Sequence, residues 1–251
     1  MIKLNPHISV DCVVFGFDYK YLKVLLVDRN ITNSKSKTNN SVLKLPGALI
    51  SETEELDDAA NRVLYELTGL KDIYLKRFDV FGNRSRMANP EDVKWLHEFT
   101  GLKIDRVVTI GYYSLVKLSD ANPNFNISNI AHWVDINQIP KLAFDHNQIL
   151  TGALNTLRKE LRTEPVGFEL LPEMFSIRQV QNLYEIILGN KLDNRNFRKR
   201  FLKLIYIKPQ NIKEENVNHK PALLYRFDRA LYEQKQNKTL EFYFNNSVCT
   251  Y

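Results

Sequence analysis

The first thirty residues alternate between apolar runs and a short polar turn. The two runs within ISVDCVVFGFDYKYLKVLLVDR (residues 8–29) are rich in β-branched and aromatic residues, and Asp18 to Lys20 separate them. Such a pair of runs predicts a β-hairpin. The polar stretch NITNSKSKTNNS (30–41) predicts a flexible loop, and the following LKLPGALI predicts a short strand that ends at Pro46-Gly47.

Residues 54–69 have the apolar spacing of an amphipathic helix. The residues on its apolar face are Leu56, Ala59, Ala60, Val63, Leu64 and Leu67. We expect Thr53 to cap this helix, and Gly69 to close it. Glu54 and Glu55 favour its positive N-terminal end.

The next hundred residues contain three strand-like runs and a second helix. The runs are IYLKRFDVFG, DRVVTIGYYSLVKL and AHWVDINQIP, with a polar stretch at 83–105 between the first two. FDHNQILTGALNTLRKELR predicts a helix of about five turns. Strands mixed with two helices indicate an α+β or α/β sandwich with a mixed sheet.

The pattern changes near residue 165, where TEPVGFELLPEMF suits a linker. SIRQVQNLYEIILG then predicts a helix capped by Ser176. Its buried stripe is expected at Val180, Leu183, Ile187 and Leu188. DNRNFRKRFLKLIYI predicts a second helix, capped by Asp193 or Asn194, and a short hairpin follows. We therefore expect two domains, at residues 1–164 and 165–251.

Composition places the chain among ordinary globular proteins. Hydrophobic residues make up 44% and charged residues 25% of its 251 residues. It contains no apolar run of about 18 residues and no secretory signal pattern. Cys12 and Cys249 are too few for a disulfide framework. We expect a cytoplasmic protein without a metal or another cofactor.

The net charge of +6 is unevenly distributed. Residues 1–165 carry 21 Lys and Arg against 20 Asp and Glu, whereas residues 166–251 carry 14 against 9. The excess of positive charge in the last third indicates a module that binds a polyanion. A merely solvated basic surface would produce the same count.

The second C-terminal helix combines a basic face with a buried stripe. Asn194, Arg195, Arg198 and Lys199 lie around its first turns, while the apolar residues Phe197, Phe201 and Leu204 point elsewhere. In a helix-turn-helix module the second helix enters the major groove of DNA. There Arg suits guanine and Asn suits adenine, because each side chain can form paired hydrogen bonds. Taken alone, such a helix is also compatible with a solvated face.

Residues 47–70, GALISETEELDDAANRVLYELTGL, resemble the Nudix box, G-x5-E-x7-R-E-U-x-E-E-x-G-U, where U is aliphatic. The positions that match are Glu54, Arg62, Leu64, Glu66, Gly69 and Leu70. The resemblance implies a loop–helix–loop on an α/β/α sandwich, whose carboxylates hold Mg²⁺ against a diphosphate.

Three departures from the box bear on its chemistry. Ala48 replaces the first Gly, Val63 replaces the Glu after Arg, and Leu67 replaces the second Glu of the pair. Because Mg²⁺ needs several oxygen ligands, we expect hydrolysis to be lost. The remaining Glu54, Arg62 and Glu66 form a structural ion pair, since Arg62 and Glu66 are four apart, or they line a retained ligand pocket.

The order of motifs along residues 8–232 resembles the Nudix-related transcriptional regulators of bacteria, and most closely their arabinose-responsive branch. The motifs are VDCVVFGF, DDAA-x-RVL-x-ELTGL, W-V-D-I-N-x-x-P, FDH, GF-x-LLP-x-MF and L-D-x-R-N-F-R-K-R. The resemblance implies a C-terminal winged helix-turn-helix domain after the Nudix-type sandwich. The DNA-binding residues it implies, with neighbouring cations, are Arg178, Asn194, Arg195, Asn196, Arg198, Lys199, Arg200 and Lys220.

The resemblance also implies a homodimer that binds operator DNA and a small effector. The effector would be a sugar such as L-arabinose, or ADP-ribose. Candidate effector-binding residues at strand ends and turns are Asp11, Phe81, Arg84, Asp145 and His146. Taken alone, Phe81 is more typical of a core position and His146 of a structural turn. The stretches 33–41 and 84–105 depart from the arabinose branch and leave the effector open.

Two other functions are compatible with parts of the pattern. An active Nudix hydrolase of a nucleoside diphosphate derivative would need replacement metal ligands, for which Glu52 and Glu55 are the spare carboxylates. A protein-interaction module without DNA binding would leave the basic helix at 193–203 without a role.

Overall fold

The computed structural model describes residues 3–18, 20–29, 42–118, 131–215 and 220–236. The chain divides into two compact units: Met1–Gly16 with Leu22–Asn155, and Phe17–Tyr21 with Thr156–Tyr251. The division after Asn155 falls within a helix, nine residues before the boundary expected from the sequence. The predicted loop at 30–41 and Cys249 lie outside the described residues.

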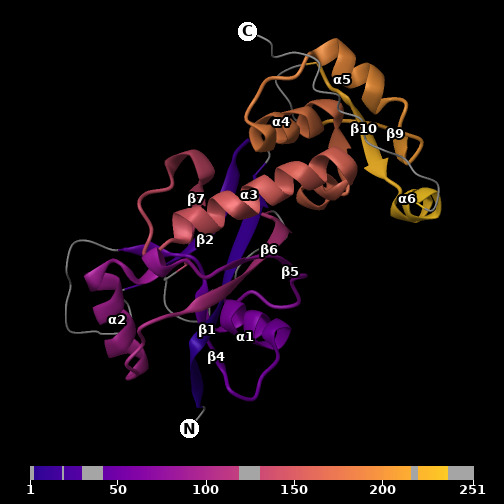
Figure 1. Cartoon of the computed structure of the whole chain (residues 1–251). Coiled ribbons are helices and arrows are strands. Elements are labelled where there is room, and N and C mark those ends of the chain that lie inside the picture. Colours follow the sequence, from indigo (N-terminus) through magenta and orange to yellow (C-terminus); the bar gives the residue numbers. More distant parts are fainter. Residues whose placement is uncertain (1–2, 19, 30–41, 119–130, 216–219, 237–251) are drawn as a thin grey trace. The chain divides into compact units, whose positions relative to one another are not determined.

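The first unit is built on a seven-stranded sheet in the order β3-β2-β1-β6-β5, with β4 paired to β1 and β7 to β2 (Figure 1). The strands are β1 (Leu4–Phe17), β2 (Leu22–Asp28), β3 (Leu43–Lys44), β4 (Gly47–Ser51), β5 (Lys76–Phe81), β6 (Val108–Lys117) and β7 (Ala131–Asp135). The predicted hairpin is confirmed, since β1 and β2 are neighbours. The strand predicted to end at Pro46-Gly47 is instead interrupted: β3 ends at Lys44 and β4 begins at Gly47, after Pro46, which has no amide hydrogen to donate to a sheet.

Helix α1 (Leu56–Thr68) packs its apolar face on this sheet. Its buried residues Ala59, Ala60 and Val63 belong to the same core cluster as strand β1 residues. Gly69 ends the helix in the left-handed conformation, as predicted (φ 75°). The predicted cap at Thr53 is wrong: the helix begins after Glu55, whose side chain makes no capping hydrogen bond.

The polar stretch at 83–105 contains a helix that the apolar pattern does not predict, α2 (Pro90–Thr100), preceded by the 3₁₀ helix η2 (Arg84–Met87). The boundary signals of α2 are present: the Asn89 side chain accepts from the amide of Glu91, and Gly101 closes the helix. The predicted five-turn helix is confirmed as α3 (His146–Thr163). A short 3₁₀ turn, η3 (Ile136–Gln138), follows β7.

The second unit contains the predicted pair of helices followed by a hairpin. Its elements are η4 (Val166–Leu170), β8 (Met174–Ser176), α4 (Ile177–Leu188), α5 (Asn194–Phe201), β9 (Ile207–Lys213), β10 (Leu223–Phe227) and α6 (Arg229–Gln236). The three strands form an antiparallel sheet in the order β8-β10-β9. Ser176 caps α4 within a full capping box, and Asp193 rather than Asn194 caps α5.

Aromatic packing forms the core of the second unit. Phe197 and Phe201 are buried on one face of α5, where they contact Tyr184 and Tyr225. The basic residues of α5 are thereby left on its other faces. Among the described residues, no helix is both long and apolar enough to cross a membrane.

Candidate functional site

The surviving residues of the box form an ion-pair network at the start of α1. The Arg62 guanidinium donates to both carboxylate oxygens of Glu54, at 2.9 and 2.6 Å, and to Glu66 Oε2 at 3.0 Å. The hydrogen bond from Arg62 lowers the pKa of Glu54, and the same bond raises the pKa of Arg62. These side chains therefore already satisfy one another.

The two substituted box positions belong to the apolar core. Val63 is fully buried and Leu67 packs against the same cluster. Of the spare carboxylates, Glu52 pairs with Lys3 at 2.9 Å and Glu55 is exposed. The described residues contain no group of three His, Cys, Asp or Glu side chains that could hold a metal ion. The residues present do not fit the Mg²⁺ site of a Nudix hydrolase.

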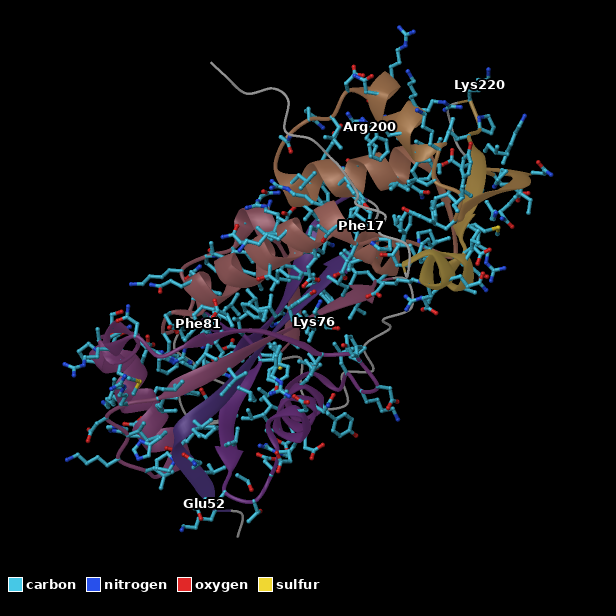
Figure 2. The ribbon with its side chains drawn as sticks, turned by 45° about the vertical axis from the view of Figure 1, so that its right-hand side comes forward. Phe17, Glu52, Lys76, Phe81, Arg200 and Lys220 are labelled. Atoms are coloured by element: carbon cyan, nitrogen blue, oxygen red, sulfur yellow. The ribbon has the colours of Figure 1, made fainter. Side chains whose placement is uncertain are left out.

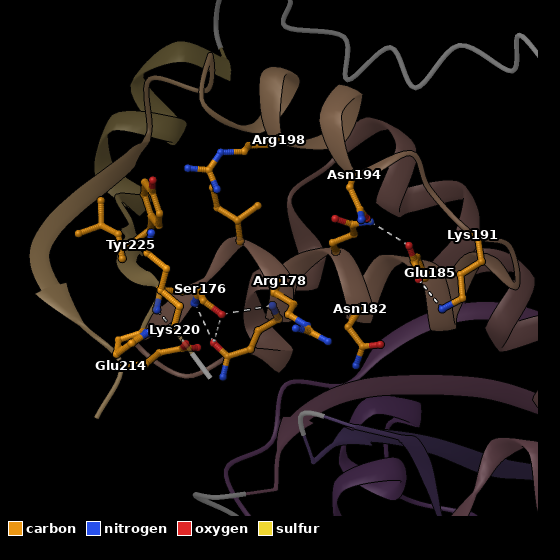
Figure 3. Close-up of a pocket in the computed structure, with 16 residues that line it drawn as sticks. Ser176, Arg178, Asn182, Glu185, Lys191, Asn194, Arg198, Glu214, Lys220 and Tyr225 are labelled. Atoms are coloured by element: carbon orange, nitrogen blue, oxygen red, sulfur yellow. Dashed lines mark hydrogen bonds and ion pairs between the residues drawn. The ribbon is translucent and has the colours of Figure 1, made fainter. Parts of the chain in front are cut away.

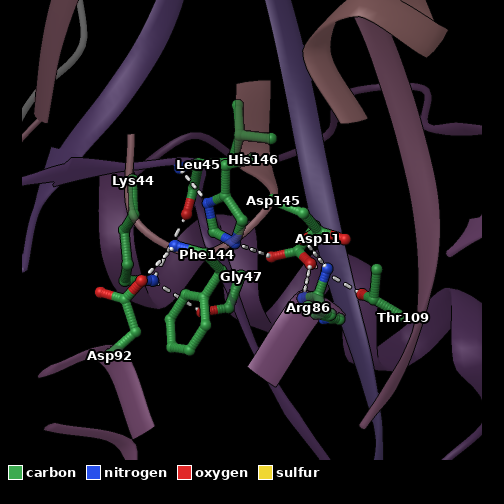
Figure 4. Close-up of polar contacts among 10 residues, drawn as sticks. All are labelled: Asp11, Lys44, Leu45, Gly47, Arg86, Asp92, Thr109, Phe144, Asp145 and His146. Carbon is green, nitrogen blue, oxygen red and sulfur yellow. Dashed lines mark hydrogen bonds and ion pairs between the residues drawn. The ribbon is translucent and has the colours of Figure 1, made fainter. Parts of the chain in front are cut away.

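A buried charge cluster lies beside the box (Figure 4). Arg86 donates to Asp11 Oδ2 at 2.8 Å and also to Asp145, and the Thr109 hydroxyl donates to the same Asp11 oxygen at 2.8 Å. His146 completes the cluster, with Nε2 3.5 Å from Asp11 Oδ1. All five side chains are buried. We refer to Asp11, Arg86, Asp145 and His146 as the buried charge cluster.

His146 is neutral in this cluster. Its Nδ1 accepts a hydrogen bond from the Leu45 amide at 2.9 Å, so the ring proton lies on Nε2, facing Asp11. Burial lowers the pKa of His146 to about 3. Burial also acts to raise the pKa of Asp11, but the surrounding positive charge and the Thr109 hydrogen bond lower it. The Asp11 carboxylate is therefore ionised.

A cavity of about 540 Å³ lies against the cluster in the first unit. Asp11, Arg86 and His146 line it, and so do the box residues Arg62 and Glu66. Lys44 also lines the cavity; its ammonium group donates to the Gly47 carbonyl at 2.8 Å, and burial lowers the pKa of Lys44 to about 8. The remaining box residues Arg62 and Glu66 therefore lie at a cavity, as the ligand-pocket interpretation of the box requires.

Gly47 is required by the close approach of two strands at this cavity. It lies opposite Asp11 in the β1–β4 register, and a Cβ atom at Gly47 would come within 1.8 Å of Asp11 Oδ1. Any larger residue would displace the Asp11 carboxylate from the cluster.

The candidate effector residues separate into two groups. Asp11 and His146 line the cavity, and Asp145 adjoins it through Arg86. Arg84 is exposed and does not line the cavity, because two residues later on η2 it is Arg86 that points inward. Phe81, which Figure 2 labels, lies in the first unit. It packs edge-to-face on Phe78 and does not line the cavity either.

Sequence reasoning missed several cavity residues. Arg86 lies two positions from a residue that was singled out, and Lys44 precedes the Leu45-Pro46-Gly47 turn. Trp95 and Phe99 lie on helix α2, which the apolar pattern does not predict. The sequence signal for this helix is Asn89-Pro90, a pair typical of a helix start.

In the second unit, polar side chains fix the turn between α4 and α5. Gln181 donates to the Leu192 carbonyl at 3.1 Å and to Asn194 Oδ1 at 2.5 Å. Glu185 accepts from the Leu192 amide at 3.1 Å and from Lys191 at 2.7 Å. The side-chain oxygen of Asn194 is therefore engaged within the protein.

The candidate DNA-binding residues gather on α5 and around a neighbouring groove. The groove has a volume of about 1100 Å³ (Figure 3). The four candidates that line it are Arg178, Asn194, Arg198 and Lys220. The other four candidates, Arg195, Asn196, Lys199 and Arg200, are exposed on α5 and lie outside the groove lining. Arg200 and Lys220 are labelled in Figure 2.

Comparison with known families accounts for both units. Residues 5–152 match the NUDIX domain. The chain belongs to the Nudix family. Residues 167–227 match the NrtR DNA-binding winged helix domain, so the Nudix domain is followed by a winged helix of that type. The α/β fold with a mixed sheet and a C-terminal winged helix, expected from the sequence, is confirmed.

Individual relatives share this two-domain arrangement. An ADPR responsive transcriptional repressor of Acinetobacter baylyi is 29% identical over 242 residues, covering 95% of this chain and 88% of the relative. The Shewanella oneidensis NrtR crystal structure in complex with a 27mer DNA matches with a TM-score of 0.66 and 27% identity, covering 88% and 93% of the two chains. An Enterococcus faecalis MutT/nudix family protein, 20% identical with a TM-score of 0.61, shares the fold. The predicted resemblance to Nudix-related regulators is confirmed.

Proposed function

We propose that this protein is a transcriptional repressor whose Nudix domain binds a small effector and whose winged helix binds operator DNA. The observation that carries the proposal is the combination, in one chain, of a Nudix box with an apolar metal-binding face and a winged helix with an exposed basic helix. The Acinetobacter baylyi relative is a repressor, and the Shewanella oneidensis relative was crystallised on DNA.

Helix α5 supplies the DNA-binding surface in this proposal. Arg195 and Lys199 lie one turn apart and are exposed, on the side away from the buried Phe197 and Phe201. Such residues at the start of a recognition helix reach base edges and phosphates in the major groove. Arg178 and Lys220, at the groove beside α5, add cations for the phosphate backbone.

We propose ADP-ribose as the effector. The support is the ADPR response of the Acinetobacter baylyi relative, together with a cavity that box residues Arg62 and Glu66 still line. L-arabinose, the alternative from the sequence resemblance, offers the cavity hydroxyl groups but no anionic group. The two effectors are therefore distinguishable by direct titration.

The substitutions in the Nudix box explain why the effector would be bound but not hydrolysed. Val63 and Leu67 supply no oxygen ligand, and Arg62 is ion-paired with both Glu54 and Glu66. We expect no Mg²⁺-dependent hydrolysis of ADP-ribose. The assembly we propose is a cytoplasmic homodimer on a pseudo-palindromic operator, as two-fold symmetry would require.

The test is fluorescence anisotropy with a labelled duplex from upstream of the protein's own gene neighbourhood. The titration is repeated with ADP-ribose, L-arabinose and other pentoses, each at two salt concentrations. We expect salt-sensitive binding that ADP-ribose weakens by about 5- to 150-fold, the usual range of allosteric coupling. Affinity equal to that for random DNA would contradict repression at this site. Formation of AMP and ribose 5-phosphate from ADP-ribose with Mg²⁺ would contradict the loss of hydrolysis.

A further inference from the structure

Helix α2 is anchored at the cavity by a buried carboxylate. Asp92 accepts from the Arg29 guanidinium, from Asn89 Nδ2 at 2.9 Å and from the Phe144 amide at 2.8 Å. Phe144 has a left-handed backbone (φ 53°), a conformation that is costly for a residue with a side chain. Asp92 thus fixes both α2 and the strained turn before His146.

Two aromatic residues on the same side of α2 as Asp92 line the cavity. They are Trp95, about one turn after Asp92, and Phe99, about two turns after it. Trp95 and Phe99 are stacked, with centroids 5.0 Å apart and an interplanar angle of 8°. Phe99 nevertheless remains 48% exposed. Phe144 holds the Trp95 ring from the edge, at a centroid distance of 6.3 Å. The two rings form an aromatic surface that faces the cavity.

Two buried polar atoms of residues that line the cavity have no hydrogen-bond partner. Within the described residues, only three buried side-chain nitrogen or oxygen atoms have no hydrogen bond, and two of them are Ser9 Oγ and Arg29 Nε. Both residues line the cavity, and they are 6% and 9% exposed. A buried polar atom without a partner is costly, so such atoms point to a ligand that would satisfy them.

The charged side chains around the cavity are largely held in ion pairs within the protein. The cations that line it are Arg29, Lys44, Arg62 and Arg86, and the carboxylates are Asp11, Asp28 and Glu66. Three of these cations are already paired with carboxylates: Arg29 with Asp92, Arg62 with Glu54 and Glu66, and Arg86 with Asp11 and Asp145. The charge of the lining therefore does not by itself select an anion. The volume of about 540 Å³ also lies within the roughly 300–1,000 Å³ typical of pockets for drug-sized ligands.

We propose that Trp95 and Phe99 form a stacking platform for the purine base of a nucleoside diphosphate effector, with Ser9 and Arg29 hydrogen-bonding to the bound molecule. The proposal rests on the proposed function and assigns the specificity for the base to α2. An aromatic base stacked on a protein ring commonly raises affinity by about 5- to 150-fold. The base, rather than the pentose, would then distinguish the effector from free sugars.

The experiment uses the full chain with the substitution Trp133→Phe, which leaves Trp95 as the single tryptophan and fluorescent reporter. Fluorescence is titrated with ADP-ribose, AMP, ribose 5-phosphate and L-arabinose. We expect ADP-ribose and AMP to quench Trp95. In the Phe99→Ala variant, their Kd should rise about tenfold, while Phe99→Tyr should keep the affinity of the parent. Tyr74→Ala, which removes a 79% exposed ring of the same unit, is the matched control.

Ser9→Ala provides a second variant with an independent readout. Because the Ser9 hydroxyl has no protein partner, its removal should weaken ADP-ribose about fivefold without lowering the thermal midpoint of the free protein. A loss of stability with unchanged ADP-ribose affinity would assign the hydroxyl to the fold instead.

The outcomes separate the platform from the proposed function. Unchanged ADP-ribose affinity in Phe99→Ala, or an equal loss for ribose 5-phosphate, overturns the platform and leaves ADP-ribose as effector. Binding of L-arabinose with no binding of either adenine compound overturns both the platform and the ADP-ribose effector, while the DNA-binding assignment stands on its own titration.

Discussion

Arg86 in the first unit and Arg195 in the second carry the same guanidinium group in opposite surroundings. Arg86 is 5% exposed and lies between the carboxylates of Asp11 and Asp145. Arg195 is exposed on a short helix whose buried side is aromatic. The comparison shows that burial and partners, rather than residue type, determine whether an arginine holds the fold together or remains accessible to an external anion.

The two regions also differ in what a substitution would disturb. Removing a buried charge leaves its partners uncompensated in a medium of low polarity, so the cost falls on stability. Removing an exposed charge changes the field outside the protein and barely affects folding. The comparison would be contradicted if removal of a buried charge left stability unchanged, or if removal of an exposed charge destabilised the fold.

The largest effect is expected from Arg86→Met. Asp11 and Asp145 would remain buried without their shared cation, and the free energy of unfolding should fall by about 3–5 kcal/mol. Urea denaturation measures this change. Arg84→Met, two residues earlier and exposed, is the matched control and should stay within about 0.5 kcal/mol of the parent. Equal effects of the two substitutions would show that the cluster does not stabilise the fold.

A smaller effect is expected from acidification through His146. The unfolded chain protonates this side chain below its ordinary pKa of 6.5, whereas the folded protein does so only near its lowered pKa of about 3. Stability due to neutral His146 is therefore complete above pH 6.5 and is lost as the pH falls toward 3, by about 1.4 kcal/mol per pH unit at most. His146→Asn, which can still accept from the Leu45 amide, should flatten this dependence in urea melts between pH 7 and pH 5. An unchanged slope would place the acid sensitivity in another group.

The smallest change in free energy is expected from Arg195→Ala. Loss of one phosphate contact should weaken operator binding about tenfold and reduce the slope of log K against log salt by about 1. The unfolding free energy should not change, since Arg195 is exposed. Anisotropy titrations at several salt concentrations measure the slope, with Arg106→Ala, an exposed arginine of the first unit, as control. A fall in affinity without a change in salt slope would indicate a contact other than phosphate.

Much of the architecture could be predicted because its signals are local. The spacing of apolar residues identified α1, α3, α4 and α5, and Ser176 and Asp193 marked helix starts through side chains that reach three residues along the chain. The loss of metal ligands at Val63 and Leu67 and the excess of basic residues after 165 were equally visible. These features depend on residue type and spacing alone.

The cavity is formed by contacts between residues that are far apart in the sequence. Asp11 meets Arg86 75 positions later, and the Leu45 amide that sets the His146 tautomer is 101 positions from that ring. No periodicity distinguishes Arg86 from Arg84 before η2 gives each a direction, and α2 was missed because its inward face mixes Asp92 with aromatic residues instead of presenting an apolar stripe. The sequence by itself determined the two domains, the apolar box and the basic helix. Only the tertiary structure decided which charges are buried and which rings line the cavity, because burial is a property of the packed chain and not of any local segment.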